Sequence, residues 1–193
     1  MLTDLERKSR GQSLAEAFFF RADQELWQSL REKLNREEKI RAFETVIGIR
    51  DSKVVHCLVD AGFDLSTAMA FIWAPAMFVA WADGEADHLE KEIILNHLPS
   101  KGVSPDATSM IIQHEWFTSP PSSDLWQLWV DFASDFLRNG SVEDREAVAN
   151  EIINLCRDVA EASGGFMGFL KMSQLEVETI NRVVAALKSI GDE

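Results

Sequence analysis

Four carboxylates crowd into one short stretch of the chain. The sequence VAWADGEADHLEKE contains Asp83, Glu85, Asp87 and Glu90, all placed where a turn between two helices is expected. Hard cations such as Ca²⁺ and Mg²⁺ bind several carboxylate or carbonyl oxygens at once, so a turn of this composition could hold one of them. The spacing differs from that of an EF-hand loop. The chemistry that these residues predict is therefore the binding of a divalent cation.

The same residues could also cap helices. In a capping box, the side chain of the N-cap residue accepts a hydrogen bond from the N3 backbone N–H, and the N3 glutamate accepts one from the N-cap N–H. Asp87 and Glu90 have this spacing, and Gly84 suits the left-handed turn that ends a helix. Capping alone, and capping combined with cation binding, are both open interpretations of this turn.

A similar pattern occurs nearer the C-terminus. The segment VAEASG at residues 159–164 resembles the earlier VAWADG, and Glu176 occupies the place of Glu90 after an insertion. We interpret this similarity as a weak two-fold internal repeat, and Glu176 becomes the fifth candidate metal ligand. Ser163 stands where the first copy has Asp83, so a second cation site of equal strength is not expected.

Helical periodicity with capping signals runs through most of the chain. Apolar residues recur at helical spacing, and no stretch alternates with the two-residue period of a strand for long enough to indicate a sheet. The sequence predicts an all-α fold, a compact bundle of about nine helices. These helices are expected to begin near Ser13, Asn35, Asp51, Leu65, Asp87, Ser104, Ser123, Ser141 and Ser173.

Residues 65–82 form an uncharged stretch at the lower length limit for a membrane span. The stretch is rich in alanine, and neither end carries the Lys or Arg that anchors a membrane helix. A helix that is apolar on all sides also suits the centre of a soluble bundle. We expect a buried central helix, kinked at Pro75, whose carboxylate-rich end faces water, in a protein that is not itself transmembrane.

The composition excludes several classes of function. A formal net charge of −13 disfavours nucleic acid as a partner and favours a cation or a protein surface.

The cysteines, Cys57 and Cys156, have no zinc-ligand spacing. Only Glu85 and His88 have the Glu-x-x-His spacing of a di-iron site, and no nucleophile elbow occurs. We therefore expect a protein that is not an enzyme, and the absence of a signal-peptide pattern predicts the cytoplasm.

The expected domain organisation is simple. Residues 1–12 are interpreted as a tail, and residues 13–193 as a single helical domain. Within that domain, residues 13–64 form an added helical region and residues 65–190 form the core.

The acidic turn resembles a motif of the TerB-like domain of tellurite-resistance proteins. The resemblance rests on a helix ending in Ala-Asp-Gly-Glu, a following acidic stretch and an altered second copy, and it covers roughly residues 71–187. It implies a compact all-helical fold, a bacterial cytoplasmic setting and a role in resistance to tellurite and other stresses. It also implies acidic loops that hold divalent metal and partners that are associated with the membrane.

Two functions are carried forward from these observations. The first is a non-enzymatic stress-response module that binds a divalent cation, Ca²⁺ or Mg²⁺, at the acidic turn. The second is a structural protein–protein interaction domain that uses its acidic surface or the apolar loop between Phe166 and Phe169.

Overall fold

The computed structural model describes residues 32–33, 35–100, 117–162 and 172–191. The chain divides into two compact units, residues 1–41 and residues 42–193. The described residues of the first unit are helical. The described part of the second unit contains one π-helical turn and seven α-helices, with no strand. The predicted all-α class is confirmed, whereas the helices expected to begin near Ser13 and Ser104 lie outside the described residues.

The elements of the second unit follow one another with short connections. Most begin at or next to the polar residue that the sequence marks as a cap, as at Asp51, whose carboxylate accepts a hydrogen bond from the Lys53 N–H at 2.8 Å. The elements are η1 (Phe43–Ile47), α2 (Ser52–Asp60), α3 (Leu65–Phe71), α4 (Pro75–Ala80), α5 (His88–Ser100), α7 (Ser123–Arg138), α8 (Val142–Ala162) and α9 (Gln174–Gly191).

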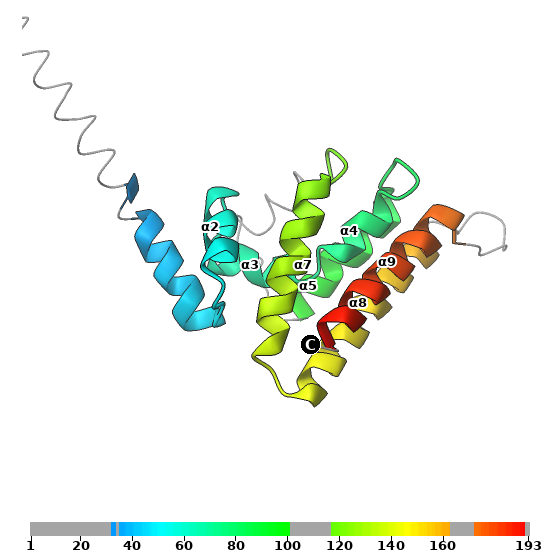
Figure 1. Cartoon of the computed structure of the whole chain (residues 1–193). Coiled ribbons are helices and arrows are strands. Elements are labelled where there is room, and N and C mark those ends of the chain that lie inside the picture. The colour runs from blue at the N-terminus through cyan, green and yellow to red at the C-terminus, as the bar shows by residue number, and fades with distance from the viewer. Residues whose placement is uncertain (1–31, 34, 101–116, 163–171, 192–193) are drawn as a thin grey trace, which may run out of the picture. The chain divides into compact units, whose positions relative to one another are not determined.

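Helix α8 is the element on which much of this unit packs. It contacts α4, α5 and α9, and α9 also packs against α4 and α7. Figure 1 shows α8 and α9 lying side by side and running in opposite directions. The apolar stripe of α8 that faces these neighbours includes Ile152, Leu155, Cys156 and Val159, all buried. Burial of such stripes is the main contribution to the stability of a helical bundle.

The predicted continuous helix over residues 65–82 is wrong, because the stretch forms two helices. Helix α3 ends at Phe71 and α4 begins at Pro75, with a turn between them. A proline has no N–H and sits best at the first position of a helix, so Pro75 starts a helix here instead of kinking one. The predicted burial is found, since residues 70–77 are all buried. None of the described helices combines the length and the apolar character needed to cross a bilayer.

The turn before Pro75 leaves a buried carbonyl that needs a partner. In a continuous helix the Ile72 carbonyl would accept from the Ala76 N–H, but that N–H donates to the Trp73 carbonyl at 3.1 Å. The indole N–H of Trp129, on α7, donates to the Ile72 carbonyl instead, also at 3.1 Å. Trp129 is fully buried, and this bond therefore replaces water at a site that water cannot reach.

A second set of polar contacts fixes the start of this unit to α7. The Asp135 carboxylate accepts from the backbone N–H groups of Arg50 and Asp51. The Asn139 amide donates to the Gly48 carbonyl at 2.8 Å. Gly48 has a φ of 80°, a left-handed conformation that glycine adopts at low cost, and this conformation ends η1.

We predict that Trp129→Phe destabilises the protein by about 1–3 kcal/mol, because the buried Ile72 carbonyl then has no donor. The measurement is the free energy of unfolding from urea titration. Trp126→Phe is the comparison variant, since no hydrogen bond of its indole N–H is found within the described residues and phenylalanine keeps an aromatic face for the Arg182 guanidinium, which lies 3.8 Å from the Trp126 ring. Equal losses in the two variants would contradict the role of the Trp129 bond.

Candidate functional site

The acidic turn begins where α4 ends. Gly84 has a φ of 103°, so the chain reverses direction here through a conformation that side-chain-bearing residues rarely adopt. Asp83 accepts a hydrogen bond from the backbone N–H of Glu85 at 3.2 Å. Both carboxylates are exposed to solvent. The first half of the turn is thus an exposed acidic surface. The hydrogen bond to Asp83 stabilises its backbone.

The second half of the turn forms the predicted capping box. The Asp87 carboxylate accepts from the Glu90 N–H at 2.9 Å, and the Glu90 carboxylate accepts from the Asp87 N–H at 2.7 Å. These two bonds satisfy backbone donors that the start of α5 would otherwise leave unpaired. Capping is therefore an established role of Asp87 and Glu90.

The start of α9 is built in the same way. The Ser173 hydroxyl accepts from the Glu176 N–H at 3.1 Å, and the Glu176 carboxylate accepts from the Ser173 N–H. The two capping boxes have the same reciprocal pattern, as the proposed correspondence between Glu90 and Glu176 requires. The internal repeat itself stays a prediction, because Ser163 and most of the intervening segment lie outside the described residues.

Both capping glutamates are buried, and for Glu90 this differs from the expectation that the carboxylate-rich turn faces water. Glu90 and Glu176 are each only 2% exposed. Helices α5 and α9 both pack against α8, and both contact α4, so the beginnings of the two helices enter the same layer of the bundle. The predicted exposure is therefore wrong for Glu90, whose side chain turns back along its own helix toward the Asp87 N–H.

Burial and neighbouring charge act together on Glu90. Its pKa is raised from an ordinary 4.5 to about 7, and the largest cause is removal of the carboxyl group from water. The hydrogen bond from the Asp87 N–H lowers the pKa, whereas the negative charges of Asp87, Glu176 and Asp83 raise it. Glu90 is therefore the electrostatic centre of the candidate site, and four of the five predicted carboxylates interact there.

The remaining predicted ligand, Glu85, is exposed and is not among the charges that raise the pKa of Glu90. Across the described ranges, no group of three or more His, Cys, Asp or Glu side chains has an arrangement that could hold a metal ion. The fold brings four carboxylates within electrostatic range without assembling them into a ready ligand set. A cation would have to bind these carboxylates in addition to the hydrogen bonds that they already accept.

A signal for the burial of the two glutamates was present in the sequence. Glu90 lies four residues from Ala86 and four from Ile94, both buried. Glu176 likewise precedes Ile180 by four residues on the buried stripe of α9. Residues four apart share one helix face, so each glutamate occupies an apolar position of its helix.

Comparison of the chain with protein-family models, with curated proteins and with solved structures gives no match. The similarity to TerB-like domains therefore rests on the motifs of the sequence alone, and it stays a prediction.

We predict that stability falls as the pH rises from about 5 to 7, because the folded state binds the Glu90 proton more tightly than the unfolded chain does. The pKa in the folded state is raised, so this contribution is complete below pH 4.5 and is lost as the pH passes 7. The slope reaches at most about 1.4 kcal/mol per pH unit. Urea unfolding between pH 5 and 8 measures it.

Glu90→Gln keeps an oxygen for the Asp87 N–H and has no proton to release in this range, so its stability should vary less with pH than that of the wild type. The exposed Glu85→Gln is the matched control and should keep the wild-type slope. A Glu90→Gln variant with the unaltered slope would contradict the assignment of this titration to Glu90.

Proposed function

We propose that the chain is a non-enzymatic stress-response module of the TerB-like kind, which binds a divalent cation at the turn from Asp83 to Glu90 with Glu176 nearby. The observation that supports this proposal is the electrostatic crowding of Asp83, Asp87 and Glu176 around the buried Glu90. No described feature points to a reaction.

The physical argument is the relief of repulsion between like charges. Several carboxylates held by the fold in one region repel one another, and that repulsion is strongest where water is excluded. A Ca²⁺ or Mg²⁺ ion near them would reduce it and would link the end of α4 to the start of α5. The cation would thereby stabilise the folded state by mass action.

The capping bonds limit how tightly such an ion could bind. Asp83, Asp87 and Glu90 each accept a backbone hydrogen bond. An ionised carboxylate has about four acceptor positions, so each of these groups retains capacity for a cation. Since no ligand set is assembled among the described residues, we expect dissociation constants of about 10⁻⁴ to 10⁻³ M, at the weak end of calcium sites.

We predict that 10 mM Ca²⁺ or Mg²⁺ raises the Tm by roughly 3–10 °C relative to chelator, from the mass-action stabilisation at that affinity. The Asp83→Asn, Glu90→Gln double variant should lose most of this rise. Thermal unfolding followed by circular dichroism measures both, with NaCl added to equalise ionic strength.

The matched control is Asp124→Asn with Glu143→Gln, which removes the same charge from exposed positions on α7 and α8. This control should respond to metal as the wild type does. An identical response from the wild type and the Asp83→Asn, Glu90→Gln variant would end the cation proposal.

The second candidate function is a protein-interaction domain that uses its acidic surface. One observation favours it: capping bonds alone account for Asp87 and Glu90, while the carboxylates of Asp83 and Glu85 are left facing solvent. A basic surface on a partner protein would complement them. The apolar loop between Phe166 and Phe169, the other predicted contact, lies outside the described residues.

We predict under this alternative that Asp83→Lys with Glu85→Lys reduces capture of a partner by the immobilised protein at least tenfold, because like charges would then meet at the interface. Quantitative pull-down from cell lysate measures the change. Asp124→Lys with Glu143→Lys is the control of equal charge, and capture that survives both double variants equally would count against an interface at the turn.

A further inference from the structure

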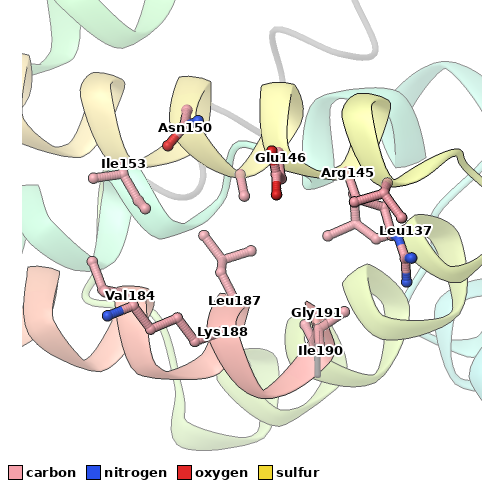
Figure 2. Close-up of a pocket in the computed structure, with 12 residues that line it drawn as sticks. Leu137, Arg145, Glu146, Asn150, Ile153, Val184, Leu187, Lys188, Ile190 and Gly191 are labelled. Carbon is pink, nitrogen blue, oxygen red and sulfur yellow. The ribbon is translucent and has the colours of Figure 1, made fainter. Parts of the chain in front are cut away.

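A groove lies between α8 and α9, well away from the acidic turn. Its volume is about 580 Å³, within the range of ligand sites in proteins. Apolar side chains from three helices line it, and in Figure 2 those of α8 and α9 face each other across the open space. They are Leu137 of α7, Ala149 and Ile153 of α8, and Val184, Leu187 and Ile190 of α9.

The apolar lining continues to the surface at one end of the groove. Val142 lines the groove at the start of α8 and is 54% exposed, whereas the larger apolar residues of this helix, Val148, Ile152, Ile153 and Leu155 among them, are buried or half-buried. Exposed apolar surface joined to a hollow is typical of a binding site.

The charged residues at the groove differ from the rest of this acidic chain. Arg145 and Lys188 both line it, and neither makes an ion pair within the residues that the structure describes. Figure 2 places Arg145 at the end next to Leu137 and Lys188 beside Val184. Glu146 is the single acid among the lining residues that the structure describes, so the charged side chains of that lining sum to +1 in a protein of net charge −13.

We propose that this groove binds a free single-chain anionic amphiphile, with its acyl chain along the apolar lining and its carboxylate at Arg145. Charge complementarity selects the head group. A guanidinium presents a planar pair of donors that matches a carboxylate. Arg145 is half-buried, so water screens its charge less than it screens that of the exposed Lys188. Repulsion from Glu146 opposes binding, and the guanidinium of Arg145 must outweigh it at this end of the groove.

The size of the groove suits one acyl chain. A carbon-sized group needs about 30 Å³, the share that a water molecule takes in the liquid. The groove therefore holds roughly nineteen such groups, enough for a chain of twelve to sixteen carbons with its carboxylate. Each methylene that enters the lining should strengthen binding about fourfold.

The test is calorimetric titration of the full chain with dodecanoate below its micelle threshold. Octanoate should bind at least tenfold more weakly, because four methylenes are missing. Dodecyltrimethylammonium, which has the same chain and the opposite charge, should also bind at least tenfold more weakly. Binding to vesicles of phosphatidylcholine with phosphatidylglycerol is measured in parallel. Stronger binding to the vesicles than to free dodecanoate would identify a membrane surface as the source of the anion.

Three variants locate the binding. Ala149→Trp fills the groove and should weaken dodecanoate binding at least tenfold, with folding checked by circular dichroism. Val142→Glu places a negative charge at the mouth, at a helix start where an acid is favourable, and should weaken it similarly. Arg145→Gln should weaken it about five- to tenfold. The exposed Arg157→Gln, on the same helix but outside the groove, is the matched control and should bind as the wild type does.

Several outcomes would overturn the proposal. They are no binding of dodecanoate in the millimolar range, equal binding of the cationic amphiphile, unchanged binding by Val142→Glu, and vesicle binding that exceeds binding of the free acid. A dimer or an N-terminal segment that covers the groove and is not displaced by dodecanoate would overturn it as well. These results are independent of the cation proposal, since no carboxylate of the acidic turn lines the groove.

Discussion

The hydrogen bond from the Trp129 indole to the Ile72 carbonyl makes the buried centre of the second unit possible. Pro75 divides the uncharged stretch, and the Ala76 N–H donates to the Trp73 carbonyl, so the Ile72 carbonyl needs another donor inside the protein. Without that partner, the burial of residues 70–77 would leave a polar group desolvated and unpaired, at a cost comparable with a large part of net stability. The alanines of this stretch also let α4 lie close to α8 and α9.

The acidic turn follows directly from that arrangement. Helix α4 ends within the packed layer, and Gly84 turns the chain so that α5 can return against α8. The capping carboxylate of Glu90 is therefore carried into the protein, and that of Glu176 enters in the same way from α9. Two buried caps are tolerable because each satisfies a backbone N–H. Burial raises the pKa of Glu90 to about 7, with smaller contributions from the charges of Asp87, Glu176 and Asp83. Near neutral pH the raised pKa of Glu90 adds no stability to the folded state.

The groove between α8 and α9 lies apart from this centre and has a different character. The turn gathers negative charge around buried carboxylates, whereas the groove presents apolar side chains beside Arg145 and Lys188. The two regions share only α9, which carries Glu176 near its start and part of the groove lining near its end.

By itself, the sequence determined the helical class, most helix starts and both capping boxes, because these depend on residues three or four positions apart. It also placed the burial of the stretch around Pro75 correctly, since eighteen uncharged residues leave little choice. The spacing also indicated that Glu90 and Glu176 are buried, because each lies four residues from an apolar residue. The acidic composition of the turn indicated the opposite for Glu90, a side chain exposed to water. Only the tertiary structure decided that Pro75 separates two helices, that Trp129 supplies the missing donor from 57 residues away, and that the two capping glutamates interact. Those contacts join residues distant in the chain, and their formation depends on how α4, α7, α8 and α9 pack, which no local spacing specifies.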